Sequence, residues 1–103
     1  MDGERKPPKV SLASFYLPQG TGNPKMFADL NFLAPDGDIV CTVKGFKLMS
    51  RENGGFWLGV PQRKHNEDYI DVFEFGSKSQ AEEARALLHA IYETEVAKRE
   101  EFR

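Results

Sequence analysis

Lys44–Lys64, with the sequence KGFKLMSRENGGFWLGVPQRK, is the stretch that decides the fold of this 103-residue chain. Two apolar-rich segments flank the turn Arg51–Gly55, and an Asn-Gly pair in such a turn is typical of a hairpin between antiparallel strands. The second segment ends at Pro61, which has no backbone N–H to donate to a neighbouring strand. The stretch therefore predicts a β-hairpin that runs into a short basic tract.

The same stretch is basic within an otherwise acidic chain. Residues 44–66 contain five Lys or Arg and one Glu, a net charge of +4, whereas residues 1–43 carry −1 and residues 67–103 carry −5. Local charge steers an anionic partner more strongly than the overall charge of −2 does. The candidate nucleic-acid contacts are Lys44, Lys47, Arg51, Arg63 and Lys64. The alternative is that these side chains are only solvated surface charge.

Alternating apolar and polar residues predict two strands before the hairpin. Lys9–Leu17 suits a half-buried first strand, and Lys25–Leu33 has the clearest alternation in the chain. The residues that share the apolar face of this second strand are Met26, Ala28, Leu30 and Phe32. Ala34–Gly37 contains Pro, Asp and Gly in turn-forming order, so the second strand should fold back into a third.

The third strand changes its apolar parity at a glycine. Apolar residues occupy odd positions from Ile39 to Val43 and then even positions, at Phe46 and Leu48. One extra residue in a strand produces such a switch and bends the strand. We therefore expect a β-bulge at Lys44–Gly45.

The C-terminal third predicts one long helix. Tyr69–Phe75 has ambiguous parity and suits a fifth strand or an extended segment, and the helix follows over about residues 77–99. Ser79–Glu82 fits a capping box at its start, and Ser77–Gln80 offers an alternative start. The apolar stripe of the helix, suited to docking on a sheet, consists of Ala84, Leu87, Leu88, Ile91 and Val96.

These elements together predict a single α+β domain over residues 9–103. The expected architecture is an antiparallel, twisted β-sheet of four to five strands with one long C-terminal helix packed on it. Met1–Pro8 is polar and is expected to be a disordered lead-in. Because one helix has several strong strands to cover, a partner should hide one sheet face or edge, and we expect a homodimer.

No catalytic centre or metal site is predicted. The single cysteine, Cys41, excludes an internal disulfide and a cysteine-based metal cage, and in a strand it is expected to be a small buried hydrophobic residue. His65 and His89 lack metal-ligand spacing, and Asp36–Asp38 lacks the ligand pattern of a calcium loop. We expect no enzymatic activity, cofactor or small-molecule substrate.

No apolar run approaches the roughly 20 residues that span a membrane. Met1–Lys9 has no hydrophobic region of the kind found in a signal peptide. The sequence therefore predicts a cytoplasmic protein that does not enter a membrane.

A family resemblance emerges from the order of these motifs. Gly45–Leu48, the Asn-Gly turn, the run GFWLGVPQRK at Gly55–Lys64, the segment Tyr69–Asp71 and a capped C-terminal helix resemble the SpoVG family of septation and sporulation regulators. The likeness covers about Lys9–Tyr92. It implies a homodimeric, sequence-tolerant regulator that binds DNA or RNA without catalysis, and whose dimer forms by strand pairing between protomers.

The resemblance also implies particular contacts. Arg63 and Lys64 carry over as nucleic-acid-binding residues, and Lys47 stands where the family usually has a basic strand residue. Gln62 departs from the family pattern, which usually has Ser at this position.

Two alternatives stay open from the sequence. Trp57 lies on the strand face opposite Phe56 and could stack on unpaired bases or fill a subunit interface. Phe56, Tyr69 and Phe73 are read as core or interface packing. The alternative function is a protein-interaction adaptor whose acidic helix end binds a basic partner through Glu93, Glu95, Glu100 and Glu101.

Overall fold

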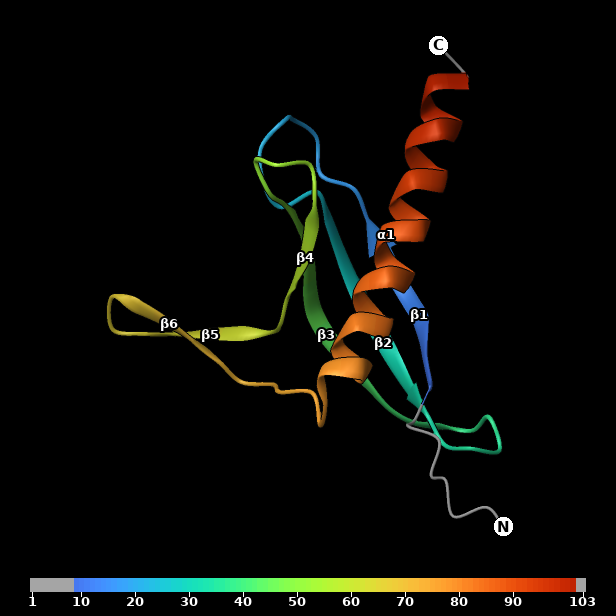
Figure 1. The fold of residues 1–103 in the computed structure, drawn as a ribbon. Coiled ribbons are helices and arrows are strands. Elements are labelled where there is room, and N and C mark those ends of the chain that lie inside the picture. Colours follow the sequence, from blue (N-terminus) through green and yellow to red (C-terminus); the bar gives the residue numbers. More distant parts are fainter. Residues whose placement is uncertain (1–8, 102–103) are drawn as a thin grey trace.

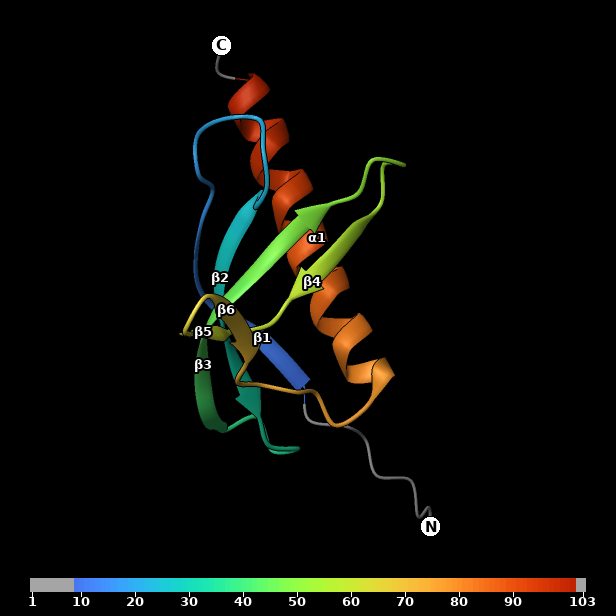
Figure 2. The same cartoon turned by 90° about the vertical axis from the view of Figure 1, so that its left-hand side faces the viewer.

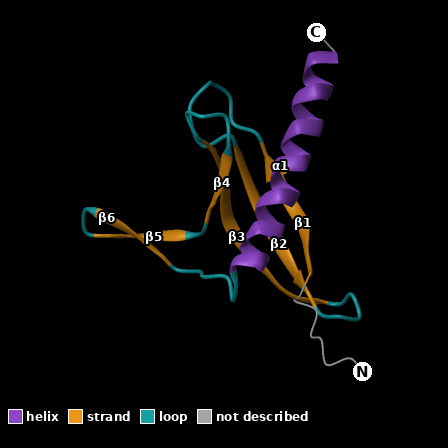
Figure 3. Ribbon diagram, in the orientation of Figure 1, coloured by secondary structure: helices purple, strands orange, loops and turns teal. Residues whose placement is uncertain are grey.

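The computed structural model describes residues 9–101, so the lead-in predicted at Met1–Pro8 lies outside the described residues. The described chain forms six strands and one helix (Figures 1 and 3). In chain order they are β1 (Lys9–Tyr16), β2 (Met26–Leu33), β3 (Ile39–Ser50), β4 (Phe56–Gly59), β5 (Gln62–His65), β6 (Asp68–Asp71) and α1 (Lys78–Glu101).

The first four strands form one antiparallel sheet in the order β1-β2-β3-β4. Each strand pairs with the next one along the chain, and α1 contacts all four of them from one face (Figures 1 and 2). The predicted α+β class, with an antiparallel sheet and one long C-terminal helix, is confirmed.

The predicted fifth strand is only partly present. Asp68–Asp71 is a strand, but it pairs with Gln62–His65 in a separate two-stranded sheet, and residues 72–75 belong to no strand. The strand Gln62–His65 was not predicted, because its four polar residues carry no apolar alternation. We call the resulting hairpin, Gln62–Asp71, the arm.

The arm projects beyond the β4 edge of the sheet, away from β1 (Figure 1). Its base is fixed by Pro61, which is buried, and by a hydrogen bond of 2.9 Å from the Val72 amide to the Pro61 carbonyl. The molecule is extended, with a radius of gyration of 15.2 Å, compared with about 13 Å for a compact domain of 100 residues.

The predicted bulge in β3 is confirmed. Ala28 pairs with Phe46 and Leu30 with Val43, so Lys44 and Gly45 together face the single residue Asp29. Gly45 has a φ of 102°, a backbone conformation that residues with a Cβ rarely adopt. A strand that carries such an extra residue bends and twists more strongly.

A second bulge, which the sequence did not reveal, lies at the same level in β1. Leu12 pairs with Leu30 and Ser14 with Asp29, which leaves Ala13 as the extra residue. The Asp29 carboxylate connects the two bulges, because it accepts hydrogen bonds from Ser14 Oγ at 2.9 Å and from the Gly45 amide at 3.2 Å.

The hydrophobic core lies between α1 and the inner face of the sheet. Its buried members are Leu17, Met26, Ala28, Leu30, Phe46, Leu48, Ala84 and Leu88. The predicted apolar face of β2 and the predicted helix stripe are thus confirmed, with Phe32, Leu87, Ile91 and Val96 half-buried against this core. Phe73 also packs here, because its ring meets Phe46 edge-on at a centroid distance of 5.2 Å.

The alternative helix start is the one that forms. Ser77 Oγ accepts a hydrogen bond from the Gln80 amide at 3.2 Å, and Gln80 Oε1 accepts one from the Gly76 amide at 3.1 Å. The first bond satisfies a donor that the first turn of a helix leaves free, and the second ties the residue before the cap to the helix. The capping box predicted at Ser79–Glu82 is wrong, because both residues lie inside α1.

The expected burial of Cys41 is wrong. Cys41 is exposed, and its neighbours Ile39 and Val40 are 59% and 68% exposed. The start of β3 is not covered by a packed layer. Instead an open, largely apolar groove of about 400 Å³ lies there, with Phe73 and Phe75 on its far wall.

We expect Gly45→Ala to lower the free energy of unfolding by about 1–3 kcal/mol, which urea denaturation would measure. A Cβ at this position would lie 3.6 Å from Pro61, an ordinary contact, so the loss arises from the positive φ. Gly22→Ala is the control, because its backbone is not in that region and nothing lies within 4 Å of the added Cβ. Equal stability of the two variants would contradict the positive φ of Gly45 as the cause of the loss.

Candidate nucleic-acid interface

The structure places the five predicted basic contacts in three locations. Lys44 and Lys47 lie on β3, Arg51 lies in the turn between β3 and β4, and Arg63 and Lys64 lie on the arm. Lys47 is half-buried and the other four are exposed. Within residues 9–101, none of the five forms an ion pair with another described residue. Their charges are therefore not neutralised by the described part of the chain.

The arm separates its two basic side chains. Arg63 pairs with Ile70 and Lys64 with Tyr69, and consecutive residues of a strand point to opposite faces. The arm also contains three acidic residues, so its net charge is −1. Arg63 and Lys64 thus do not form a common basic patch on the arm.

A more strongly basic region lies beside β4, the edge strand. Here a shallow depression of about 350 Å³ runs between β4 and the first turns of α1. We call it the β4 groove, and it is lined by Arg51, Phe56, Trp57, Leu58, Lys78, Ala81, Glu82 and Arg85. Three basic side chains and one acidic side chain give it a local charge of +2.

Local structure holds Arg51 at one end of the β4 groove. The Arg51 amide donates to the Gly55 carbonyl at 2.7 Å, and the Gly54 amide donates to the Arg51 carbonyl at 3.0 Å. The Asn53 side chain accepts a further bond from the Gly55 amide at 3.1 Å. The Asn-Gly-Gly turn therefore fixes the backbone from which Arg51 extends.

The helix supplies the other two basic residues, Lys78 and Arg85, and the sequence analysis missed both. They lie in a segment whose net charge of −5 masked them. Their spacing of seven residues, two helical turns, was the signal that they share one helix face. Lys78 stands in the first turn of α1, which contains no acidic residue, so its charge adds to the positive end of the helix dipole.

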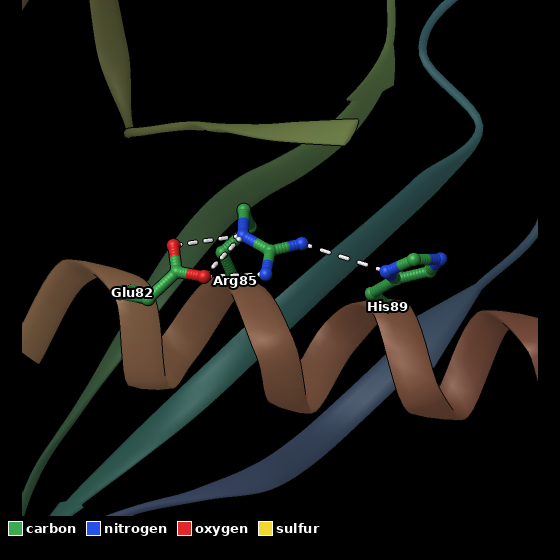
Figure 4. Close-up of polar contacts among 3 residues, drawn as sticks. All are labelled: Glu82, Arg85 and His89. Carbon is green, nitrogen blue, oxygen red and sulfur yellow. Dashed lines mark hydrogen bonds and ion pairs between the residues drawn. The ribbon is translucent and has the colours of Figure 1, made fainter. Parts of the chain in front are cut away.

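A ladder of polar contacts runs along the same flank of α1 (Figure 4). Arg85 Nε donates to both carboxylate oxygens of Glu82, at 3.0 and 2.9 Å. Arg85 Nη1 lies 3.5 Å from His89 Nδ1, and His89 Nε2 lies 3.0 Å from Glu93. The hydrogen bond from Arg85 holds the pKa of Glu82 below its usual value, and the pKa of Arg85 is raised for the same reason.

This pairing divides the basic residues of the β4 groove into two kinds. Arg85 is partly compensated by Glu82, whereas Arg51 and Lys78 form no ion pair with another residue in the described range. These two side chains are consequently the ones most available to an anion.

The two aromatic residues of β4 face opposite sides, as predicted. Phe56 packs inward, with ring centroids 4.3 Å from His89 and 5.6 Å from Tyr92. Trp57 is 40% exposed and lies at the rim of the β4 groove. Tyr69, predicted to be packed, is 65% exposed on the arm, so its place in a subunit interface stays a prediction.

The acidic helix end of the adaptor hypothesis is partly paired within α1. Glu93 contacts His89, and Lys98 Nζ lies 3.4 Å from Glu95. Among the described residues, no group of three metal-ligating side chains gathers, and no helix is long and apolar enough to cross a membrane.

Comparison with family models, curated proteins and solved structures finds no match to this chain. The resemblance to the SpoVG family therefore stays a prediction based on its motifs.

We expect Arg85→Gln to raise the pKa of Glu82 towards its usual value, as measured by NMR titration of the side-chain carboxyl. A carboxyl with a lowered pKa stabilises the folded state above its unfolded pKa, and this contribution disappears as the pH falls through the folded pKa. Arg99→Gln, at the far end of the helix, should leave the titration of Glu82 unchanged. An unaltered pKa in Arg85→Gln would contradict the hydrogen bond as its cause.

Proposed function

We propose that this protein is a small, dimeric regulator of the SpoVG type that binds nucleic acid mainly through the phosphate backbone. One observation carries the proposal: the β4 groove presents Arg51 and Lys78, without ion-pair partners in the described chain, next to the exposed Trp57. Such a combination of cations and an aromatic ring suits a polyanion whose bases are also accessible.

The physical mechanism is charge neutralisation with release of counterions. Lys and Arg side chains that contact phosphates displace condensed cations, so binding weakens as the salt concentration rises. Phosphate contacts carry no sequence information by themselves, which fits a regulator of DNA or RNA with broad sequence tolerance. With about three phosphate contacts from each protomer, the log–log salt slope of a dimer on B-DNA would be on the order of −5.

The shape of the chain supports the dimer. The arm exposes Tyr69 and Ile70, and Val72 directly after the arm is exposed too; Tyr69 and Val72 are 65% and 55% exposed. Near the base of the arm, β4 pairs only with residues 47–50 of β3, so the earlier part of that edge has no partner strand in the described chain. Unpaired edges and apolar side chains of this kind are normally covered.

We propose that a second copy covers them. In this arrangement the arm of one protomer packs against the start of β3 and the adjoining apolar groove of the other, and the exposed Ile39 and Val40 become buried. A twofold dimer would duplicate every phosphate contact. We place the action of the dimer in the cytoplasm, in the control of gene expression, septation or sporulation.

The β4 groove can be tested with two charge-matched double variants. We expect Arg51→Gln/Lys78→Gln to bind a fluorescent oligonucleotide at least tenfold more weakly, since tenfold corresponds to the loss of about one charged hydrogen bond. The salt slope should also become shallower by about 0.9 for each lost contact on duplex DNA. Lys98→Gln/Arg99→Gln changes the net charge equally at the far end of α1 and should bind normally.

These outcomes distinguish an effect of the charges in the β4 groove from an effect of the net charge of the protein. Equal weakening by both double variants would show that only net charge matters, and normal binding by both would remove the β4 groove from the interface. Arg63→Ala/Lys64→Ala, measured in the same titration, tests the contacts that the family resemblance implies.

The dimer predicts twice the chain mass of 11.7 kDa in light scattering at micromolar concentration. We expect Val40→Glu to give the monomer mass, because it places a charge in an apolar interface without disturbing a buried position. Gln19→Glu adds the same charge to an exposed loop residue and should remain dimeric. A monomeric wild-type protein would contradict the proposed assembly.

A further inference from the structure

The outer face of the sheet, opposite α1, carries a row of side chains that the β4 groove does not use. The strand registers pair Tyr16 with Phe27, Phe27 with Lys47, and Lys47 with Gly59. Met26 and Ala28 on either side of Phe27, and Phe46 and Leu48 on either side of Lys47, are buried inward. Strand alternation therefore directs Tyr16, Phe27 and Lys47 outward, side by side across three strands.

One end of this row is an aromatic stack. The rings of Tyr16 and Phe27 lie 5.3 Å apart between centroids and are nearly parallel, with an interplanar angle of 9°. Tyr16 is 59% exposed, so the stacked pair is open to solvent on the tyrosine side. The described chain leaves most of this tyrosine uncovered, so its place on the surface is not explained by packing in the core.

The other end of the row is Trp57. A Cβ built on Gly59 would lie 3.7 Å from the Lys47 Cβ and 3.8 Å from the Trp57 ring, so the indole extends over Gly59 towards Lys47. Because Gly59 has no side chain, nothing from its own position separates the ring from the lysine. Across the sheet, the row therefore consists of an aromatic pair, a cation and an aromatic ring. It spans about 14 Å at the usual strand spacing.

This order of groups matches single-stranded nucleic acid. Unpaired bases stack on exposed aromatic rings with little dependence on sequence, and a cation between them meets the backbone phosphate. Four-stranded sheets with exposed aromatic residues bind two or three bases in this way. Bases in a duplex are already stacked on one another and are not available to such a surface.

We propose that the outer face binds single-stranded nucleic acid by stacking one base on the Tyr16–Phe27 pair and another on Trp57, with Lys47 at the intervening phosphate. The inference rests on the proposed function and specifies its ligand. Trp57 also lines the β4 groove, so one strand can pass from that groove around the β4 edge onto the outer face.

Two neighbouring features agree with this ligand. Asp29, the acidic residue of the adjacent row, has its carboxylate engaged by Ser14 and the Gly45 amide, which reduces its repulsion of a phosphate. A second protein copy on this face would bury Lys47 between aromatic rings, and lysine is depleted in protein interfaces. A nucleic-acid strand instead supplies the anion that this lysine lacks.

The test compares a 12-nucleotide oligothymidine and an oligouridine with an abasic 12-mer that has the same phosphates but no bases. For the wild type we expect about tenfold tighter binding of at least one base-bearing strand, within the range for stacking of a base on an aromatic residue. The fluorescence of Trp57, the chain's single tryptophan, should be quenched by that strand and not by the abasic one. The strand that shows the gain identifies DNA or RNA as the ligand.

Tyr16→Leu should abolish this base-dependent gain and keep the affinity for the abasic strand. Phe15→Leu, at the neighbouring residue that points to the opposite face of β1, should keep both. Retention of the gain in Tyr16→Leu, or equal binding of all strands by the wild type, would overturn the stacking role. A change of molecular mass in Tyr16→Leu by light scattering would overturn it too, because the face would then be a protein interface.

Failure of this inference can be told apart from failure of the proposed function. If stacking is absent but Arg51→Gln/Lys78→Gln still weakens abasic binding, the phosphate-binding function stands and only the outer-face role is lost. If the wild type binds no strand at low salt, both are overturned.

Discussion

The hydrogen bonds of the Asp29 carboxylate fix the geometry on which the rest of this structure depends. At one level of the sheet, β1 and β3 each have an extra residue opposite β2, and Asp29 accepts one hydrogen bond from each of these strands. A shift of one residue exchanges the two faces of a strand. Past the bulge, Phe46 and Leu48 therefore enter the core and Lys47 faces outward. The same bend brings Gly45 against Pro61, where the chain leaves the sheet for the arm.

The sheet consequently has two faces with different properties. The inner face is covered by α1 and by Phe73 and Phe75 except at the start of β3, and it holds the buried residues of the core. The outer face and the β4 edge carry side chains that are not part of the core, including Lys47 and Trp57. A small chain with an acidic total charge can in this way present basic and aromatic side chains at the β4 edge and on the outer face.

The sequence was informative wherever a single periodicity dominated. The alternation in Lys25–Leu33, the parity switch at Gly45 and the stripe of the C-terminal helix each correspond to packing against one surface, and each is present in the fold. The bulge at Ala13 was not predicted because small and polar residues surround it, so no change in the alternation of apolar and polar residues marks it. Cys41 was misjudged because strand alternation gives the face of a residue without saying whether anything covers that face.

The candidate site was only partly predictable for a related reason. Arg51 and Trp57 were identified from the hairpin, but the residues that join them in the β4 groove, Lys78 and Arg85, come from a segment about 30 residues further along the chain. Only the docking of α1 beside β4 brings these residues together, and a count of local charge cannot detect it. The arm illustrates the converse, because Arg63 and Lys64 are adjacent in sequence and yet point to opposite faces.

The exposure of Cys41 has a chemical consequence for the isolated protein. It is the chain's single thiol, and it stands at the surface of β3. Oxidation therefore cannot close a disulfide within one molecule; it can couple two molecules, cap the sulfur with a small thiol or convert it to a sulfur oxyacid. The same sulfur offers a unique attachment point for a spin label or dye, at a strand whose neighbours Ile39 and Val40 are open to solvent.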